Sequence, residues 1–304
     1  MLDCNFPTVD PADPYRLSDQ EQEIMDRLER AFCNCEKLQQ HMRFLLAKGS
    51  LYKVYNGNLL YHGCIPLNED GTFRNVTLWG RTYCGKELYE VLDSYVRKGF
   101  VAVDEAERER GRVTMWYIWL HENSPLFGKD KMATFERYFL SDPETHRERK
   151  NPYYRLLEDE QVADRILAEF GLPSQGSHIV NGHVPVRQGS GESPVKCGGK
   201  VLVIDGGFSK AYQGETGIAG YTLIYNSYGL ILAAHEPFES TEAAIEKESD
   251  IHSDSIVVKR VAERKLVGDT DVGREIKEKI QDLEKLLGAY RSGAIVERFP
   301  IKGK

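Results

Sequence analysis

The chain has 304 residues, of which 41% are hydrophobic, and it carries 40 Lys and Arg against 47 Asp and Glu. This length fits two domains or one large α/β domain, and the composition excludes a disordered or fibrous protein. The net charge of −7 gives an overall negative electrostatic field that disfavours binding of nucleic acid or of an anionic membrane, so we expect neither as a partner.

Membrane insertion and export are also disfavoured by the sequence. Uninterrupted apolar stretches such as 229–234 fall far short of the roughly 18 to 20 residues that span a bilayer. The first twenty residues are rich in Asp and Pro and lack the basic start and apolar centre of a signal peptide. We therefore expect a cytoplasmic protein.

The first strong element is a helix that follows an irregular, Pro- and Asp-rich start. Ser18 and Glu21 form a capping-box pattern, and the next stop signal is Gly49. Between them, apolar residues recur at steps of three and four and predict one helix that buries a single stripe. These apolar residues are Ile24, Leu28, Phe32, Cys35, Leu38, Met42 and Leu45.

A tight hairpin is predicted next. Residues 51–55 and 58–61 flank Asn56-Gly57, a pair that tolerates the positive φ angles of a type I′ turn. The second strand would deliver His62 to a sheet edge.

Further along, helical spacing predicts helices over 86–98 and 159–170, and the charge run 104–112 is interpreted as a solvated helix face. From residue 177 the sequence pattern becomes typical of β-strands, and it predicts short strands at 179–180, 200–204, 218–225, 229–234 and 256–261. A helix over 273–290 closes the chain, with Asp271 as its N-cap. We expect the Gly-rich loop 188–199 to be the most mobile element.

The six cysteines show no C-x-x-C spacing and are interpreted as reduced thiols that pack as small hydrophobes. We place Cys33 and Cys35 on one helix, pointing to different sides. The six are Cys4, Cys33, Cys35, Cys64, Cys84 and Cys197.

Two histidines stand at predicted strand ends beside glycine, with proline following: His62-Gly63-Cys64-Ile65-Pro66 and Asn181-Gly182-His183-Val184-Pro185. Glycine there permits close backbone approach and sharp chain reversal, which an imidazole needs to reach a metal or a phosphate. A structural role for both histidines is the competing interpretation, and the pattern alone does not separate the two.

A third motif is a strand that runs into Asp205-Gly206-Gly207, with Lys210 shortly after. Backbone N–H groups of such a turn can bind an anion, and the lysine would add positive charge. An ordinary glycine turn is the favoured alternative. Neither glycine cluster is a Walker loop or a strand-coupled G-x-G-x-x-G.

These residues resemble a known family. The His62 and His183 motifs are similar to metal-binding motifs of the phosphoprotein-phosphatase branch of calcineurin-like metallophosphoesterases. The string SPLFGKDKMATFERYFL at 124–140, with 181–185, 203–213 and 217–227, resembles the bacterial, Firmicutes-type class III fructose-1,6-bisphosphatases. The resemblance runs from about residue 17 to residue 290.

The resemblance implies a binuclear metal site, usually manganese (Mn²⁺), that hydrolyses the 1-phosphate of fructose 1,6-bisphosphate in gluconeogenesis. A hydroxide that bridges both ions would attack phosphorus in line, without a phosphoenzyme. His62 and His183 match the two histidines that ligate the second metal. Pro185 stands where other branches of the superfamily use a further histidine.

The chain departs from the family before His62. The family's D-x-H, G-D-x-x-D-R-G and G-N-H-[DE] motifs should precede that histidine, and residues 1–61 contain none of them. Two imitations, Asp250-Ile251-His252 and Gly268-Asp269-Thr270-Asp271, occur in the wrong order. We therefore interpret the chain as the carboxyl-terminal half of a longer enzyme, inactive alone because two imidazoles without a carboxylate hold a metal pair poorly.

Candidate phosphate-binding side chains are Lys129, Lys131, Arg137 and Lys210, although a surface role is the likelier expectation for each. Sugar contacts or core packing could explain the neighbouring polar and aromatic residues, and we favour the core. These residues are Trp116, Tyr117, Trp119, Glu122 and Asn123. No residue is a convincing general acid, so the catalytic residue stays unknown.

The resemblance implies an α/β fold that forms part of a four-layer metallophosphoesterase β-sandwich flanked by helices. Residues 1–100 would carry the first metal histidine, 101–175 a helical aromatic-rich insertion, and 176–304 the second sheet with its closing helix. The alternative is a non-catalytic remnant or a binding or regulatory module. Either way, a truncated sheet would expose an apolar edge that an amino-terminal half or a second copy must cover. A protein phosphatase is a third interpretation, which the 124–140 string disfavours.

Overall fold

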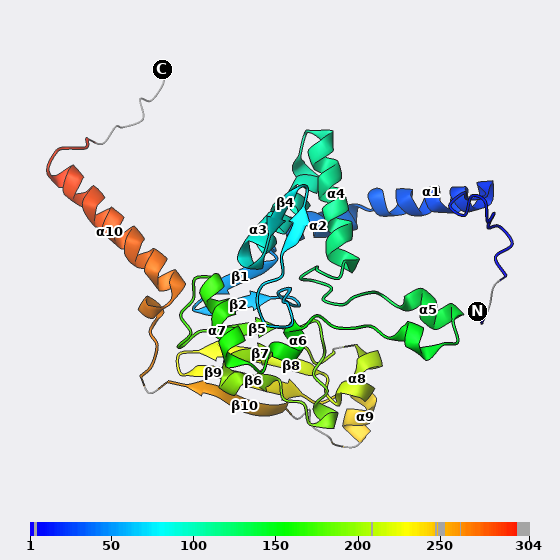
Figure 1. The fold of residues 1–304 in the computed structure, drawn as a ribbon. Helices are drawn as coiled ribbons and strands as arrows, with labels where there is room; N and C mark the ends of the chain where they lie inside the picture. The colour runs from blue at the N-terminus through cyan, green and yellow to red at the C-terminus, as the bar shows by residue number, and fades with distance from the viewer. Residues whose placement is uncertain (3–4, 208, 247, 249–252, 262, 297–304) are drawn as a thin grey trace. The chain divides into compact units, whose positions relative to one another are not determined.

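The computed structural model describes residues 1–2, 5–207, 209–246, 248, 253–261 and 263–296 (Figure 1). The chain divides into two compact units. The first comprises Met1–Lys53 and Leu59–Val184, and the second comprises Val54–Asn58 and Pro185–Lys304. Helices and strands occur in both, which confirms a mixed α/β fold. No helix in the described part of the chain is long and apolar enough to cross a membrane.

Where one long helix was predicted, the structure has two. Helix α1 spans Asp19–Cys33 and begins with the expected Ser18–Glu21 capping box, while α2 spans Glu36–Lys48. The backbone leaves the helix at Asn34, a residue type that competes with helical hydrogen bonding, and Cys35 is the extended N-cap of α2. Cys33 and Cys35 are therefore not on one helix.

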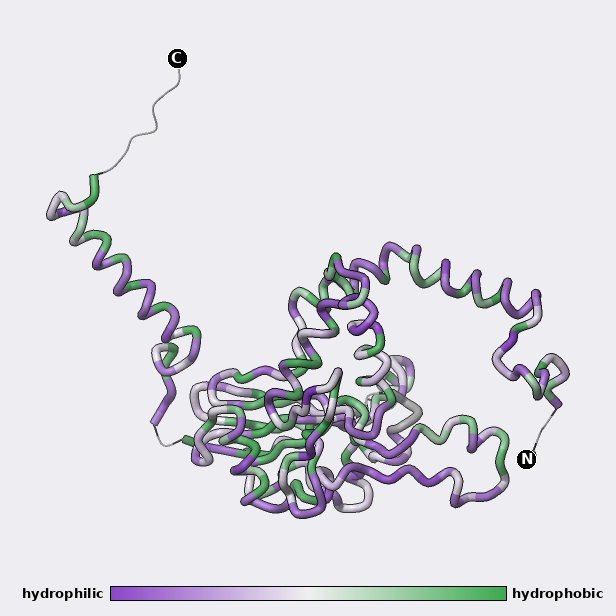
Figure 2. The backbone as a smooth tube through the Cα atoms, turned by 45° about the horizontal axis from the view of Figure 1, so that its top comes forward, coloured by the Kyte–Doolittle hydropathy of each residue, from purple (hydrophilic) through white to green (hydrophobic). Residues whose placement is uncertain are grey.

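The predicted burial of a stripe along this segment is also wrong. Neither α1 nor α2 has a buried residue. Apolar and polar positions alternate along α1, as the green and purple of Figure 2 show, but the apolar face stays at the surface. Amphipathic spacing thus predicted helical structure correctly, but it does not show whether this chain contains a surface that packs on the apolar face.

The hairpin is confirmed. Strand β1 spans Tyr52–Tyr55 and β2 spans Asn58–Tyr61, and the turn residues Asn56 and Gly57 have φ angles of 50° and 76°. In the first unit β2 lies between β1 and β5, which spans His178–Asn181. Because β2 and β5 are neighbours, the residues that follow them can meet.

A second hairpin was not predicted. Strands β3, Val76–Leu78, and β4, Arg81–Tyr83, pair antiparallel around Trp79 and Gly80, whose φ angles are 53° and 80°. Tryptophan rarely adopts a positive φ, so no ordinary turn signal marks this position.

Helices make up most of the rest of the first unit. Helix α3, Gly85–Val101, packs against α4, Glu105–Leu120, where Gly99 and Gly111 approach so closely that a Cβ on Gly111 would lie 2.3 Å from Gly99 Cα. This confirms the helices predicted at 86–98 and over the charge run. The remaining helices are α5 Thr134–Phe139, η1 Pro143–His146, α6 Tyr153–Leu156 and α7 Glu160–Glu169, the last of which was predicted.

The second unit contains the predicted β-rich part. Strand β9, Gly229–His235, pairs antiparallel with β8, Gly220–Asn226, on one side and with β10, Ser253–Arg260, on the other (Figure 1). Strand β6, Val195–Lys196, pairs antiparallel with β7, Val201–Val203, so the Gly-rich loop contains a short strand. The other elements are η2 Gln188–Ser190, η3 Cys197–Gly199, α8 Lys210–Thr216, α9 Thr241–Glu246 and η4 Val267–Asp269.

The closing helix α10 spans Asp271–Arg291, as predicted, but its N-cap is Thr270 and not Asp271. The Thr270 hydroxyl accepts from Gly273 N at 3.1 Å. Asp271 instead exchanges hydrogen bonds with the hairpin turn: its carboxylate accepts from Asn56 N at 2.7 Å, and its backbone N–H donates to Asn56 Oδ1 at 3.0 Å. Thr270 therefore caps α10, and the next residue, Asp271, joins the start of the helix to the hairpin turn by hydrogen bonds.

Candidate functional site

Two histidines 121 residues apart in the sequence come into direct contact. His62 follows β2, and His183 follows the neighbouring strand β5. His62 Nε2 lies 3.0 Å from His183 Nδ1, with the ring centroids 4.8 Å apart. A backbone hydrogen bond of 2.9 Å from Gly182 N to His62 O ties the two turns together. The structure therefore brings together the pair predicted as metal ligands.

A backbone carbonyl fixes the tautomer of one ring. His183 Nε2 lies 2.9 Å from Phe127 O, and a carbonyl oxygen can only accept, so Nε2 carries the proton. In the neutral imidazole the lone pair is then on Nδ1, the atom that faces His62. A ring N–H donated to a backbone carbonyl is the usual arrangement that orients a metal-binding histidine.

Close backbone packing positions the first histidine. A Cβ on Gly63 would lie 2.7 Å from Pro125 O, so no larger residue fits without movement of the backbone. Cys64 N donates to the same Pro125 oxygen at 3.0 Å. The 124–128 segment, which begins the 124–140 string, thus contacts both histidine turns through its carbonyl groups.

The backbone of the second histidine, His183, has a strained conformation. His183 has a φ of 69°, in the left-handed region that non-glycine residues seldom occupy. Such conformations persist where the surroundings over-determine them, and they cluster at functional sites. The hydrogen bonds to Phe127 and from Gly182 N to His62 O hold this turn in place.

Asn181 begins the second histidine motif, but the sequence analysis assigned it no role of its own. Its side chain is buried, its Nδ2 donates to Gly63 O at 3.0 Å, and its Oδ1 has no hydrogen-bond partner. A buried amide oxygen without a partner is costly, and the unexplained acceptor lies within the histidine turns. A polar residue at the end of an otherwise apolar strand was the available signal.

The region behind His62 is apolar and hydroxyl-rich. Cys64 is fully buried, and Tyr89 OH donates to its carbonyl at 2.8 Å, while the hydroxyls of Tyr61 and Tyr153 lie 2.6 Å apart. Burial raises the pKa of the Cys64 thiol to about 12, although a hydrogen bond with Tyr154 opposes this. The thiol is therefore neutral at physiological pH and packs as a small hydrophobe, as predicted.

The donor set fits two ligands of one divalent ion. Two nitrogen ligands on adjacent corners of an octahedral ion, with bonds of about 2.1 Å, lie about 3.0 Å apart. His62 Nε2 and His183 Nδ1 have this separation. Among the described residues, however, no group of three or more His, Cys, Asp or Glu side chains could hold a metal ion. The described residues therefore contain no complete metal site.

Neither imitation motif adds a ligand among the described residues. Asp250-Ile251-His252 lies outside the described residues. In the other, Asp269 Oδ2 accepts from Leu266 N at 2.9 Å, and Asp271 is engaged with the hairpin turn. Asp269 thus makes a local capping contact and Asp271 a contact with the distant hairpin turn, so neither is placed as a ligand.

The cations of the 124–140 string lie together, and each has a partner. Lys129 Nζ lies 2.9 Å and Arg137 Nη2 3.7 Å from the carboxylate of Glu148. Lys131 Nζ donates to Thr145 O at 2.6 Å. Partial burial disfavours the charged Glu148 carboxylate, but Lys129, the Ala133 amide and Arg137 outweigh it and hold its pKa below the usual range.

The Asp205-Gly206-Gly207 motif, in the second unit, forms a closed local turn. Gly207 N donates to Asp205 Oδ1 at 3.0 Å, and Val186 N donates to Asp205 O at 2.8 Å. A Cβ on Gly206 would lie 2.6 Å from Gly220 Cα, so close packing requires glycine there. This is the geometry of the ordinary glycine turn. Lys210 is the first residue of α8.

A sequence model of the family described as Firmicute fructose-1,6-bisphosphatase matches residues 1–292. The chain belongs to this family. It is 54% identical over 299 residues to "Fructose-1,6-bisphosphatase class 3" of Clostridium novyi (strain NT), a match that covers 98% of this chain and 45% of the relative.

Other relatives give the same result. Proteins with the same name from Clostridium tetani (strain Massachusetts / E88) and Alkaliphilus metalliredigens (strain QYMF) are 53% and 54% identical over 98% of this chain and 45% of their own lengths. The chain therefore spans about half the length of the curated relatives it matches, in agreement with the expected half-length relationship. No solved structure matches the chain. The family resemblance is confirmed, and the protein-phosphatase interpretation is not supported.

Two aromatic residues of this family member lie elsewhere than predicted. Trp116 and Trp119 are 60% and 62% exposed and contact each other edge to face, so the core assignment is wrong for both. Tyr117 is half-buried against Val76, Leu88 and Leu92, as predicted for core packing. The buried face of helix α4 contains Gly111 and Thr114, and the two tryptophans lie on a different face of the helix. Glu122 pairs with Arg74 at 3.9 Å.

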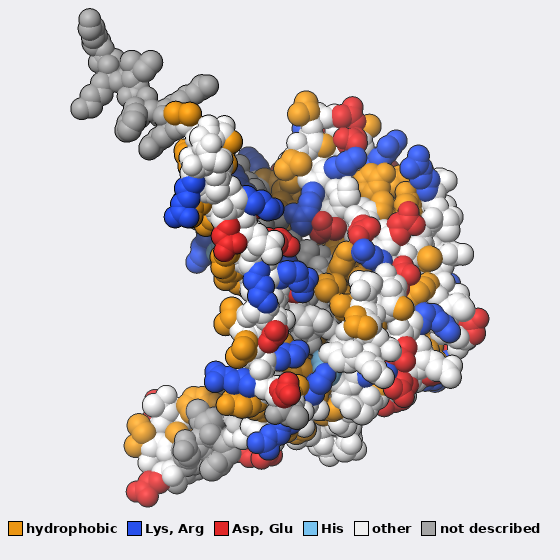
Figure 3. Space-filling view, turned by 90° about the vertical axis from the view of Figure 1, so that its left-hand side faces the viewer, with side chains coloured by type: hydrophobic (Ala, Val, Ile, Leu, Met, Phe, Trp, Pro, Cys, Tyr) orange, Lys and Arg blue, Asp and Glu red, His pale blue; other side chains and the backbone are white. Residues whose placement is uncertain are grey.

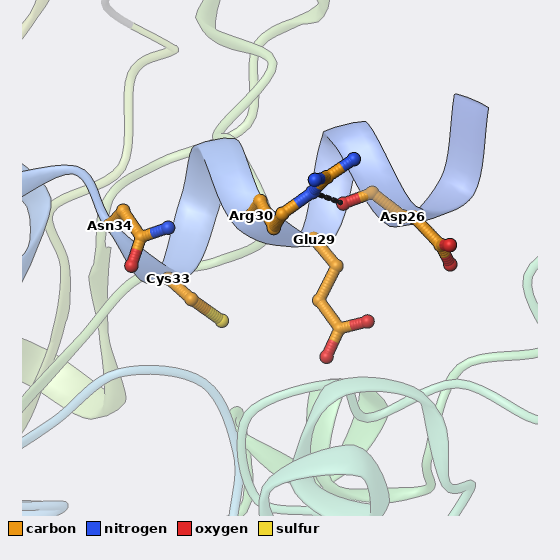
Figure 4. Close-up of a pocket in the computed structure, with 5 residues that line it drawn as sticks. All are labelled: Asp26, Glu29, Arg30, Cys33 and Asn34. Carbon is orange, nitrogen blue, oxygen red and sulfur yellow. Dashed lines mark hydrogen bonds between the residues drawn. The ribbon is translucent and has the colours of Figure 1, made fainter. Parts of the chain in front are cut away.

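A surface depression lies along α1, away from any predicted site residue in sequence. It is lined by Asp26, Glu29, Arg30, Cys33 and Asn34 (Figure 4). Arg30 Nε donates to the Asp26 carbonyl at 3.1 Å within the helix. Its lining comes from consecutive turns of one exposed helix and its end, so the depression has no second wall to enclose a ligand.

Proposed function

We propose that this chain is the carboxyl-terminal half of a fructose-1,6-bisphosphatase, a cytoplasmic phosphoric monoester hydrolase of gluconeogenesis. The whole protein would hydrolyse fructose 1,6-bisphosphate to fructose 6-phosphate and phosphate. Family membership supports the reaction class. The single observation that carries the assignment of this half is the His62–His183 pair, with facing nitrogens 3.0 Å apart and one ring oriented by Phe127 O.

In this proposal His62 Nε2 and His183 Nδ1 hold one Mn²⁺ ion of a binuclear centre. The ions would supply Lewis-acid polarisation of the phosphoryl group. In the chain alone, His62 Nε2–H donates to His183 Nδ1, so His62 must give up that proton to act as a ligand. Phe127 keeps the His183 proton on Nε2, and Asn181 fixes the His62 turn through Gly63.

Positive groups for the substrate phosphates are proposed at the basic cluster and at the glycine turn. Lys129, Lys131 and Arg137 would exchange their present carboxylate and carbonyl partners for phosphate oxygens, which gives charge-assisted hydrogen bonds of similar strength. In the second unit, Asp205, Gly206, Gly207 and Lys210 remain the proposed anion-binding turn. We propose that both units contribute to a four-layer metallophosphoesterase β-sandwich.

Two imidazoles carry no negative charge, whereas a pair of divalent ions needs carboxylates for charge neutralisation and for a short metal–metal spacing. We therefore expect the chain to be inactive alone. The test mixes it with the separately produced amino-terminal half of the Clostridium novyi relative, adds Mn²⁺, and follows phosphate release from fructose 1,6-bisphosphate. We expect activity only from the mixture.

The matched control replaces His183 with alanine in the same mixture, which should remove the activity while the two halves still associate. Activity of the isolated chain at the rate of the full-length relative would contradict the proposal. A second candidate, a folded module that binds a partner without catalysis, is favoured by the exposed apolar residues of α1 and α2. It predicts association of the halves with no phosphate release.

A further inference from the structure

Helix α10 carries an apolar seam that no other described element of its unit covers along its length. The seam residues are 45% to 63% exposed and are Ile276, Ile280, Leu283, Leu287 and Tyr290. Their spacing of four, three, four and three residues is the heptad pattern of a coiled coil, not the wider stripe of a helix packed on a globular core. Figure 2 shows the alternation of apolar and polar positions along this helix.

Contacts with the rest of the second unit are concentrated at the amino-terminal end of α10. Asp271 is clamped to Asn56, and Gly273 is buried where a Cβ would lie 1.8 Å from Val267 O. Lys277 Nζ donates to Gly268 O at 2.8 Å. Beyond this anchor the seam continues for two heptads, and Figure 3 shows hydrophobic side chains at the surface between Lys and Arg side chains on the helix that leads to the grey tail.

The residue types in the seam indicate what covers it. Taking Ile280 and Leu287 as positions a and Ile276, Leu283 and Tyr290 as positions d, the middle of the seam has isoleucine at a (Ile280) next to leucine at d (Leu283). This combination favours two parallel strands. The occupant that presents an identical seam in the same direction is a second copy of α10.

The flanking charges are complementary in that arrangement. Lys279 occupies a g position and Glu284 the e position five residues later, which is the pair that faces across a parallel two-stranded coiled coil. Two copies would therefore form this ion pair twice. In an antiparallel pair Glu284 would instead face Lys277, and that lysine already binds the Gly268 carbonyl.

We propose that two copies of this chain associate through residues 276–290 of α10 as a parallel two-stranded coiled coil. Helices shorter than about 12 to 15 residues are marginal alone in water, so a two-heptad seam gives a reversible dimer whose population rises with concentration. The proposal is independent of the catalytic assignment.

The first test is sedimentation equilibrium of the full chain over a range of concentrations, with Leu283→Asp compared with Gln281→Asp. Both variants add one negative charge at an exposed position of α10, but only Leu283 lies in the seam. We expect the unchanged chain and Gln281→Asp to reach twice the monomer mass and Leu283→Asp to stay monomeric. Circular dichroism of each variant verifies that the helix content is retained.

The charge pair gives the second test. Lys279→Glu and Glu284→Lys should each weaken the dimer several-fold, because like charges then face each other, and the double variant should restore it. A monomer at every concentration, or a dimer that Leu283→Asp leaves intact, overturns the proposal and assigns the seam to another protein segment. Failure of the double variant to restore the dimer overturns the parallel arrangement.

Discussion

The histidine turns and the basic cluster around Glu148 both lie in the first unit, and both contain predicted site residues, yet they are held by different means. The imidazoles of His62 and His183 are positioned by backbone atoms from the 124–128 segment and by a buried amide. Of the cations at 129–137, Lys129 and Arg137 pair with the Glu148 carboxylate, and Lys131 donates to the Thr145 carbonyl. A backbone-defined site keeps its geometry without a ligand, whereas a side-chain-defined cluster can exchange partners.

Within the two compared regions, the largest expected effect is at the glycine that permits the histidine contact. Gly63→Ala would place a Cβ 2.7 Å from Pro125 O. Because the obstructing atom is backbone, we expect a loss of about 1–3 kcal/mol in the free energy of unfolding, measured by urea denaturation. Gly214→Ala is the matched control, since a Cβ there meets nothing within 4 Å. Equal effects of the two substitutions would show that the 124–128 segment does not constrain the turn.

The buried amide should matter somewhat less. Asn181→Ala removes the hydrogen bond to Gly63 O and leaves that carbonyl without this donor, at a cost of about 1–2 kcal/mol. Asn181→Asp keeps the shape but turns a buried carboxylate oxygen toward the Gly63 carbonyl, so it should lose more than Asn181→Ala. The two variants are compared in the same denaturation experiment. If Asn181→Ala leaves stability unchanged, the amide does not position the turn.

The Glu148 cluster makes a smaller, pH-dependent contribution. Its carboxyl pKa is lowered from the usual 4.5, so the folded state binds fewer protons than the unfolded state in the acid range. The stabilisation is therefore complete above the ordinary carboxyl pKa and is lost as pH falls through the lowered value.

We expect Glu148→Gln to cost about 1 kcal/mol at pH 7 and to approach the unchanged chain in stability near pH 3, measured by thermal unfolding across pH. Glu144→Gln is the control, because this carboxylate is 80% exposed and pairs only with an exposed arginine at 3.8 Å among the ion pairs described. A pH-independent difference would contradict the assigned pKa direction.

The smallest effect is expected at the exposed tryptophans. Trp119→Ala should change the free energy of unfolding by less than about 0.5 kcal/mol, because its ring is mainly in solvent. Leu88→Ala, in the fully buried cluster facing α4, should cost about 2–5 kcal/mol in the same assay. A large effect at Trp119 would mean that the ring is buried in the folded protein in solution.

Local patterns predicted what is locally determined. The Asn56-Gly57 turn, the Ser18 capping box and the β-strands from 178 to 260 other than β6 follow from short-range sequence signals, and the two histidine motifs identified residues that do meet. The break at Asn34 and the Trp79 turn did not follow, because Asn34 lies inside a continuous apolar helical spacing and tryptophan rarely adopts a positive φ.

The features that the sequence did not predict depend on tertiary contacts. The orientation of His183 by Phe127, the role of Asn181 and the clamp between Asp271 and Asn56 each join segments far apart in sequence. Exposure was equally unpredictable: the apolar stripe of α1 and the tryptophans of α4 have the spacing of buried residues, and whether they are buried depends on the surface opposite them.

The central claim is that His62 and His183 are the metal-binding pair of this chain. Mn²⁺ is paramagnetic, so titrating it into chain carrying isotope-labelled histidine tests the claim directly by NMR. The account predicts that the imidazole signals of His62 and His183 broaden first, before those of His146 and His235, and that His183→Ala abolishes the selective broadening at His62. Uniform broadening of all histidines, or selective broadening at another one, would contradict it.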